Sequence, residues 1–426
     1  LSAAMATAFL HIDRFGVKHL PHVDAGFPKL SIPDVTLLRD NTSEIVVLGL
    51  TCALVIMAQT LLATNNYANR YGYKVDNTSG TITTGDNSVG IYTQGGNIDS
   101  GKISVGGQES VAIFAIGNAQ TITLNDTIAI GDTSYGIVNK GTNSTITSNV
   151  PSVNLGNDNV FIYSSDVNGN ITNNTTISST GNKNYGLYAS GTLVNDANIN
   201  MDSGVGNVGI YSLGTATNNN GRTISVGTSD PINKDFAIGM AAGYSWTDDD
   251  LALPISLRPT VQTGNIINSG IINVNNKNDI GMYATESASS VTNSGIINLN
   301  ADNTIGVYLD NGAKGTNTTT GIIKSASGLK NVLAVYVRNG AVFENYGEIK
   351  IDATNAVGAL QVGGGIFINH GIFNISGSNS IGEKTLVSQE STKIIGGVEI
   401  NVPVGATTGV ISLNGEIMTP TIVNTT

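Results

Sequence analysis

The chain has 426 residues, of which 52 are glycine and only 12% are charged, and its net charge is −11. Asn, Thr and Ser fill much of the remainder, a composition typical of β-strands and turns that excludes a mainly helical protein. The acidic balance and the lack of Lys/Arg runs speak against nucleic acid as a partner, while a hydrophobic fraction of 40% excludes a disordered tract.

Residues 1–75 form a non-repeat N-terminal segment. Within it, residues 44–63 (EIVVLGLTCALVIMAQTLLA) are apolar over nearly the length of a membrane span. Three interpretations stay open: a hydrophobic cap over the first coil, which we prefer, a retained export or membrane segment, and an assembly element for self-association. The segment holds Cys52 and the histidines at 11, 19 and 22, but these complete no ligand set, and we expect no metal site.

Residues 76–400 repeat about every 24 residues. A marker residue opens a tripeptide of the form G-[I/V/L/M]-Y, and a second phrase, N-[S/Y/H]-G, keeps the same period. Each repeat contains short apolar runs separated by Gly, Asn, Asp and Ser, which indicates strand, turn, strand. The pattern predicts an all-β fold, a parallel β-helix of about 24 residues per coil, with residues 401–426 as a C-terminal coil or continuation. The marker residues are Gly90, Ala112, Gly136, Phe161, Gly186, Gly209, Gly239, Gly281, Gly306, Ala334, Gly358 and Gly382.

Asparagine recurs three residues before the marker. At such a corner the chain must adopt a left-handed backbone conformation, which Asn tolerates. Stacked corners would also allow their amides to hydrogen-bond from one coil to the next. These asparagines are Asn87, Asn278, Asn303, Asn331, Asn355 and Asn379.

The residues on either side of the marker alternate with the marker and with the aromatic residue that follows it. A period of two therefore predicts that both flanking residues point inward. The flanking pairs are Val89/Ile91, Val111/Ile113, Tyr185/Leu187, Val208/Ile210, Ile280/Met282 and Ile305/Val307.

A surface aromatic column is then expected on the outside, beside a track of glycines. It either covers weak strand glycines or offers a flat stacking surface to sugars or a partner protein. The column comprises Tyr92, Phe114, Tyr163, Tyr188, Tyr211, Tyr283, Tyr308 and Tyr336.

A loop excursion at residues 241–262 interrupts the period, because 42 residues separate Gly239 from Gly281. Insertions in solenoids commonly carry binding. This one contains the only tryptophan and three consecutive aspartates, which would stack on and hydrogen-bond a sugar or hold a calcium ion. The alternative is a loop of solvated acids around a buried tryptophan. The candidate ligand-binding residues are Tyr244, Trp246, Asp248, Asp249 and Asp250.

The phrases NSGIINV, NSGIINL, NDIGMYA and NTIGVYL resemble the passenger domains of the large type V autotransporter adhesins of fusobacteria and their relatives. The resemblance covers about residues 76–400. It implies a right-handed parallel β-helix that is exported across the outer membrane and displayed at the cell surface. Its partner would be a glycan or protein receptor on host cells or other bacteria.

We expect a non-catalytic protein without a cofactor. Charged residues are scattered within the repeats, and neither a serine-protease stretch nor a phosphate-binding glycine loop occurs. An enzyme acting on polysaccharide would need acids and bases clustered on one strand face. The alternative function is a structural subunit of an extracellular filament or sheath, in which residues 1–75 join one protomer to the next.

Overall fold

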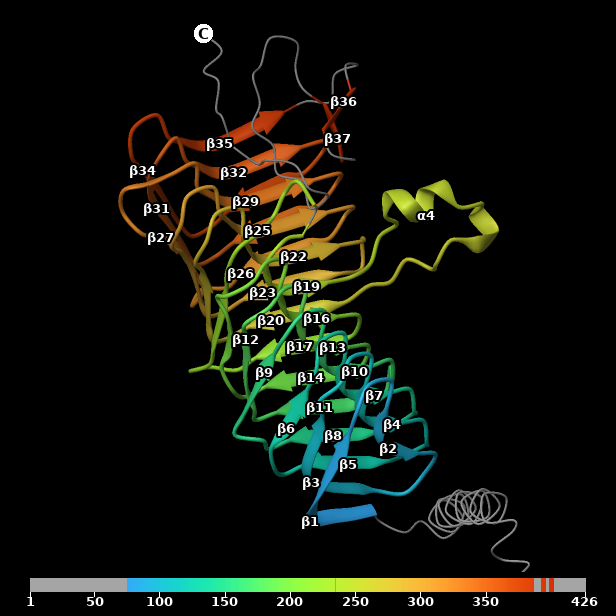
Figure 1. Ribbon diagram of the computed structural model, residues 1–426. Coiled ribbons are helices and arrows are strands. Elements are labelled where there is room, and N and C mark those ends of the chain that lie inside the picture. Colours follow the sequence, from blue (N-terminus) through green and yellow to red (C-terminus); the bar gives the residue numbers. More distant parts are fainter. Residues whose placement is uncertain (1–74, 234, 387–391, 396–397, 402–426) are drawn as a thin grey trace, which may run out of the picture. The chain divides into compact units, whose positions relative to one another are not determined.

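The computed structural model describes residues 75–386 except 234, together with 392–395 and 398–401. Residues 75–386 form a parallel β-helix of about 12 turns with about 24 residues per turn, as predicted (Figure 1). The apolar segment 44–63, Cys52, the three N-terminal histidines and residues 402–426 lie outside the described residues. In the part that is described, no helix combines the length and the apolar character needed to cross a lipid bilayer.

Successive turns contribute strands to three parallel sheets. The first sheet contains β1 (Val75–Thr84), β3 (Ile98–Val105), β5 (Thr121–Leu124), β8 (Thr145–Ser148), β11 (Asn170–Asn173), β14 (Thr192–Asn195), β17 (Thr215–Asn218), β20 (Asn265–Asn268), β23 (Ser290–Asn293), β26 (Lys314–Asn317), β30 (Val342–Asn345) and β33 (Ile366–Asn369), with β6 (Ile128–Ile130) paired to β3.

The second sheet contains the marker residues. Its strands, in order, are β2 (Val89–Thr93), β4 (Val111–Ala115), β7 (Tyr135–Asn139), β10 (Val160–Ser164), β13 (Tyr185–Ala189), β16 (Val208–Ser212), β19 (Ile238–Ala242), β22 (Ile280–Thr285), β25 (Ile305–Asp310), β29 (Leu333–Arg338), β32 (Val357–Val362) and β35 (Ile381–Leu386).

The third sheet closes the coil. It contains β9 (Ser152–Leu155), β12 (Thr176–Ser179), β15 (Ile199–Met201), β18 (Thr223–Val226), β21 (Ile271–Val274), β24 (Ile296–Leu299), β27 (Ile322–Ser325), β28 (Leu329–Lys330), β31 (Glu348–Thr354) and β34 (Ile372–Ser376). A separate antiparallel pair consists of β36 (Thr392–Ile395) and β37 (Val398–Asn401).

Aliphatic side chains from all three sheets fill the interior. In most strands of the first and third sheets buried and exposed residues alternate, so that Ile266, Ile272 and Ile297 are fully buried while the residues beside them are partly exposed. Because each coil repeats the same alternation, stacking one coil on the next extends a single core along the solenoid.

A ladder of asparagine side chains runs inside the first sheet, at the last residue of consecutive strands. Each amide nitrogen donates to the amide oxygen of the next turn over 2.7 to 3.0 Å. The asparagines that precede Asn369 are completely buried, so these bonds satisfy groups that have no access to water. The asparagine ladder comprises Asn173, Asn195, Asn218, Asn268, Asn293, Asn317, Asn345 and Asn369.

The asparagine ladder corrects part of one sequence prediction. The corner asparagines before the marker do adopt the left-handed conformation, with φ between 52° and 65°. However, among these described side chains only Asn331 and Asn303 are joined by an amide hydrogen bond, over 2.9 Å. The continuous amide stack instead belongs to the asparagine of the N-[S/Y/H]-G phrase, because that position faces the closed interior, where an amide without a partner would be costly.

The glycine of the same phrase is required by close packing. A Cβ atom on Gly295 would lie 2.0 Å from the carbonyl oxygen of Gly270, one turn away, and Gly347 has the same relation to Gly321 at 2.2 Å. Both obstacles are backbone atoms, which cannot swing aside as a side chain can. The N-[S/Y/H]-G phrase therefore repeats along the chain because each turn needs a buried amide at the first position and a residue without a side chain at the third.

The prediction that both residues flanking the marker point inward is half wrong. Met282 and its equivalents lie in the interior, but Ile280 and its equivalents pack with the tyrosines on the outer face of the second sheet. The marker itself faces inward, because a Cβ on Gly281 would lie 3.0 Å from the side chain of Ile297. The strand pairing passes over the marker, so the two-residue alternation is interrupted there.

Candidate functional site

The outer face of the second sheet carries the predicted aromatic column. Tyr188 and Tyr211 lie opposite one another in neighbouring strands, with ring centroids 4.7 Å apart, and Tyr163 meets Tyr188 edge-on at 5.0 Å. These are ordinary distances for favourable aromatic pairs. Parallel pairing in register brings the ring of one turn over the ring of the next wherever both turns carry an aromatic residue.

The column is a surface only over part of its length. Tyr92 is 40% exposed, and the rings from Tyr163 to Tyr283 are partly buried, whereas Tyr308 and Tyr336 are 1% and 2% exposed. The expectation that Tyr308 and Tyr336 form a surface is therefore wrong. Both belong to an outer apolar cluster with Leu333, in which the sheet's outward aliphatics pack between the rings.

Burial also makes these phenols harder to ionise. It raises the pKa of Tyr188 and of Tyr336 to about 12. An ordinary tyrosine is already neutral at physiological pH, and burial moves both phenols further from ionisation.

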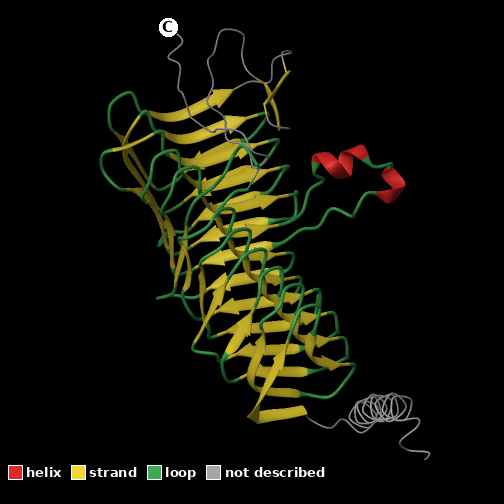
Figure 2. Cartoon of the chain, in the orientation of Figure 1, coloured by secondary structure: helices red, strands yellow, loops and turns green. Residues whose placement is uncertain are grey.

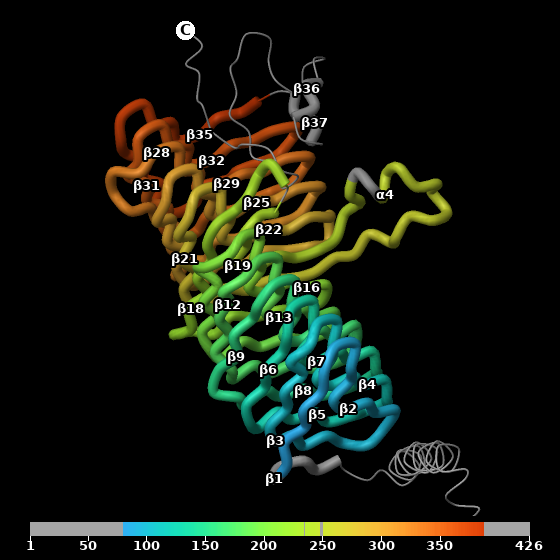
Figure 3. Tube along the Cα trace, in the orientation of Figure 1, coloured from blue at the N-terminus to red at the C-terminus, as the bar shows by residue number. Residues whose placement is uncertain are grey.

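The excursion leaves the solenoid after β19 and returns at β20. Its base is closed by an antiparallel bridge between Tyr244 and Gln262. Beyond the base it contains α4 (Asp248–Ala252) and a 3-10 helix, η2 (Ile255–Leu257). Figures 2 and 3 show this segment standing clear of the stacked strands.

Asp250 organises the first half of the excursion. Its carboxylate accepts a hydrogen bond from the Tyr244 hydroxyl, and it accepts two more from Thr247, from the backbone N–H and from the hydroxyl, both at 2.8 Å. The backbone N–H of Asp250 donates in return to the Thr247 hydroxyl over 3.2 Å, and these contacts form a capping box at the start of α4. The hydrogen bond from Tyr244, followed by those from Thr247, lowers the pKa of the Asp250 carboxyl.

Trp246 is held by the second half of the excursion. Its indole N–H donates to the carbonyl of Pro259 over 2.7 Å, and the guanidinium of Arg258 lies 5.1 Å above the ring. Arg258 is positioned in turn by the carbonyls of Leu251 and Leu253. With 40% of its surface exposed, Trp246 is not the buried plug that one interpretation expected.

Two of the predicted groups meet at the base of the excursion. The Tyr211 hydroxyl donates to the carbonyl of Gly243 over 2.8 Å, and the amide of Asn311 donates to the Ser245 hydroxyl over 3.0 Å. The aromatic column is thus in contact with the base of the excursion.

The calcium hypothesis can be tested only at Asp250, because the side chains of Asp248 and Asp249 lie outside the described residues. The carboxylate of Asp250 already accepts three hydrogen bonds from protein groups. Among the described side chains, no three His, Cys, Asp or Glu residues group as a metal site would require.

We expect Asp250→Ala to loosen the excursion without unfolding the β-helix. The substitution removes the acceptor for Tyr244 and Thr247, so the emission of Trp246, the only tryptophan, should shift to longer wavelength while the circular dichroism of the strands is unchanged. Because the Asp250 pKa is lowered, the wild type should show the same shift only as the pH falls below the ordinary value of 3.8. Identical emission spectra for the two proteins at neutral pH would contradict this role.

Apolar side chains at the tip of the excursion were not predicted. Ile255 is 78% exposed and Leu257 is 66% exposed, with Leu251 and Leu253 also exposed. The available signal was the run LALPISL, in which apolar residues flank a proline outside any repeat. We call Leu251, Leu253, Ile255 and Leu257 the excursion tip.

Residues 72–321, more than half of the chain, match the family model described as the BigA third pectate lyase-like domain. Searches of curated proteins and of solved structures returned no significant match. The match covers the coils from β1 to β26 and the excursion, and the coils from β27 to β35 lie beyond it. The chain therefore belongs to the BigA third pectate lyase-like domain family, a family of β-helix domains.

Proposed function

We propose that this chain is a non-catalytic adhesive domain of a bacterial surface protein, and that the excursion tip is its contact with a protein receptor. Membership of the BigA family supports a bacterial surface protein. The resemblance of the repeats to autotransporter passengers supports export across the outer membrane and display on the cell, where the receptor belongs to a host cell or another bacterium.

The observation that carries the proposal is the exposure of the excursion tip. Four aliphatic side chains are exposed on one short segment, although soluble proteins rarely gather apolar groups on a protruding loop without a use for them. The segment is pre-ordered by the Asp250 cap and by the Trp246–Arg258 contact. Such order reduces the entropy lost on binding, which favours recognition by a receptor groove.

Adhesion should depend on the tip. We expect the double variant Ile255→Ser/Leu257→Ser to bind receptor-bearing cells at least about tenfold more weakly than wild type, because burying each aliphatic side chain contributes roughly 1.5–3 kcal/mol. The matched control is Val167→Ser, which removes a 71% exposed aliphatic from a turn of the solenoid. Beads coated with each purified protein and counted on cells give the comparison. Equal binding of the double variant and wild type would reject the tip as the contact.

The same purified protein can be tested for two other functions, an enzymatic role and a role as a filament subunit. The family description likens the domain to a lyase of pectate, so incubation with pectate and detection of unsaturated products tests an enzymatic role. A filament subunit would instead form polymers whose length rises with protein concentration. Cleavage of pectate would overturn the non-catalytic proposal, and polymer formation without cell binding would favour the structural subunit.

A further inference from the structure

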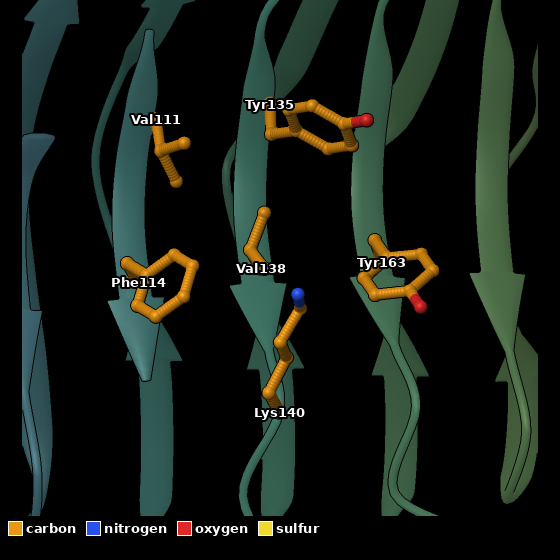
Figure 4. Close-up of a pocket in the computed structure, with 6 residues that line it drawn as sticks. All are labelled: Val111, Phe114, Tyr135, Val138, Lys140 and Tyr163. Atoms are coloured by element: carbon orange, nitrogen blue, oxygen red, sulfur yellow. The ribbon is translucent and has the colours of Figure 1, made fainter. Parts of the chain in front are cut away.

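A pocket of about 360 Å³ opens on the outer face of the second sheet, several turns from the excursion (Figure 4). This volume falls within the range of roughly 300–1,000 Å³ that is usual for small-ligand sites. Its lining comes from three consecutive strands and the turn that follows the middle one. The lining residues are Val111, Phe114, Tyr135, Val138, Lys140 and Tyr163.

In β7 an aliphatic residue stands at the aromatic position and a tyrosine at the aliphatic position, and this exchange creates the pocket. Val138 pairs with Phe114 on one side and with Tyr163 on the other, so it occupies the aromatic column with a small side chain. The two rings that flank it are separated by two strand spacings, roughly 9.5 Å, and Val138, which is only 5% exposed, lies between them. Tyr135 meanwhile takes the position that holds Val111 and Val160 in the adjacent strands, and it forms a wall of the pocket.

The polar groups at this pocket are unused within the part of the chain that the structure describes. Tyr135 and Tyr163 meet edge-on, with centroids 6.5 Å apart, and neither hydroxyl has a hydrogen-bond partner among the described residues. The Lys140 side chain runs back toward Val138 (Figure 4), and its ammonium forms no ion pair with any described residue.

We propose that this pocket binds one carboxylated sugar residue of a glycan. The apolar floor and the aromatic walls suit the C–H face of a sugar ring, the two phenols suit its hydroxyl groups, and the Lys140 ammonium suits the carboxylate. A protein of net charge −11 repels anions at long range, so selection of an acidic sugar requires a local cation of this kind. The site is separate from the excursion tip and does not depend on the proposed protein receptor.

The test uses the full chain and three soluble probes in calorimetric titrations. A sialylated lactose and a disaccharide ending in glucuronic acid carry the carboxylate from two sources, and lactose is the neutral control. We expect at least one acidic probe to bind with a Kd of about 1 mM or tighter, and lactose to bind at least about tenfold more weakly. The acidic probe that binds identifies the source of the carboxylate.

Two variants assign the binding to this pocket. Lys140→Met keeps the length of the side chain and should reduce acidic binding about tenfold, down to the affinity for lactose. Val138→Tyr fills the gap in the column with the residue that other turns carry there, and should abolish binding while leaving thermal unfolding unchanged. Lys277→Met, which removes an exposed lysine elsewhere on the solenoid, is the control and should bind as wild type.

Three results would overturn the proposal: no acidic binding at roughly 10 mM probe, equal affinity for acidic and neutral probes, or full binding by Val138→Tyr. The excursion-tip variant should bind the sugars as wild type does. Loss of cell adhesion with intact sugar binding in the excursion-tip variant, together with loss of sugar binding and intact adhesion in Val138→Tyr, would separate the two sites.

Discussion

Replacing Asn293 with Asp is expected to destabilise its part of the β-helix by roughly 3–5 kcal/mol at neutral pH, because it buries a charge without a partner cation. Asn293 is completely buried; it accepts from Asn268 over 2.9 Å and donates to Asn317 over 2.8 Å. A carboxylate keeps the first bond but replaces the second with two oxygens facing each other. Burial would raise the pKa of the new carboxyl, so the loss should shrink as the pH falls and the protonated group becomes a donor.

Hydrogen exchange is the suitable measurement for this variant. Solenoid stability is a sum over neighbouring turns, so the loss should appear as faster exchange in β20, β23 and β26 rather than uniformly. Asn300→Asp is the control, because Asn300 makes the same kind of amide bond, to Asn275 over 2.9 Å, in an exposed position. Its expected effect is within about 0.5 kcal/mol. Similar losses in the two variants would show that burial does not determine the strength of the ladder.

Gly295→Ala is expected to cost about 3 kcal/mol, at the upper end of the usual range for overpacking. The added methyl group would lie 2.0 Å from the Gly270 carbonyl oxygen and 2.8 Å from the backbone carbon of Ser269. Neither atom can move without displacing the previous turn. The strain should therefore spread to the neighbouring strands of the first sheet, which carry the asparagine ladder.

The control for this substitution is Gly85→Ala. A Cβ at Gly85 would meet no atom within 4 Å, and its backbone is not in the left-handed region. We expect Gly85→Ala to leave denaturant unfolding within about 0.5 kcal/mol of wild type. An equally small change for Gly295→Ala would mean that adjacent turns can separate, and that close packing does not explain the glycine in the repeated phrase.

The parts of this protein that follow from local chemistry were predictable. A period of about 24 residues without helical spacing was sufficient for the parallel β-helix, because each coil must bury its apolar residues against the next one. The left-handed corners at Asn87 and Asn303 also follow from the residue type alone. In both cases the property belongs to a few consecutive residues.

The direction of each side chain could not be obtained in this way. Ile280 faces outward and Gly281 inward because the strand alternation is interrupted at the marker, and the inward position of Gly281 lies against Ile297 of the third sheet. Likewise, nothing in the phrase N-S-G distinguishes an exposed amide from the buried amide of Asn293. Contacts with other turns decide both features.

The candidate sites also combine features that the local sequence predicted with features that only the folded structure shows. The length and composition of the excursion pointed to Tyr244, Trp246 and Asp250, but only the folded loop shows that the Asp250 carboxylate is engaged in a capping box with Thr247. The pocket around Val138 likewise has no local signature, since a valine in a strand is ordinary. It exists because residues about 24 positions apart are placed side by side by strand pairing. The sequence by itself determined the repeating unit and its corners, whereas the ladder, the buried end of the aromatic column and the pocket around Val138 were decided by the stacking of one turn on another. The excursion was decided by contacts within its own fold, among them the capping box of Thr247 and Asp250.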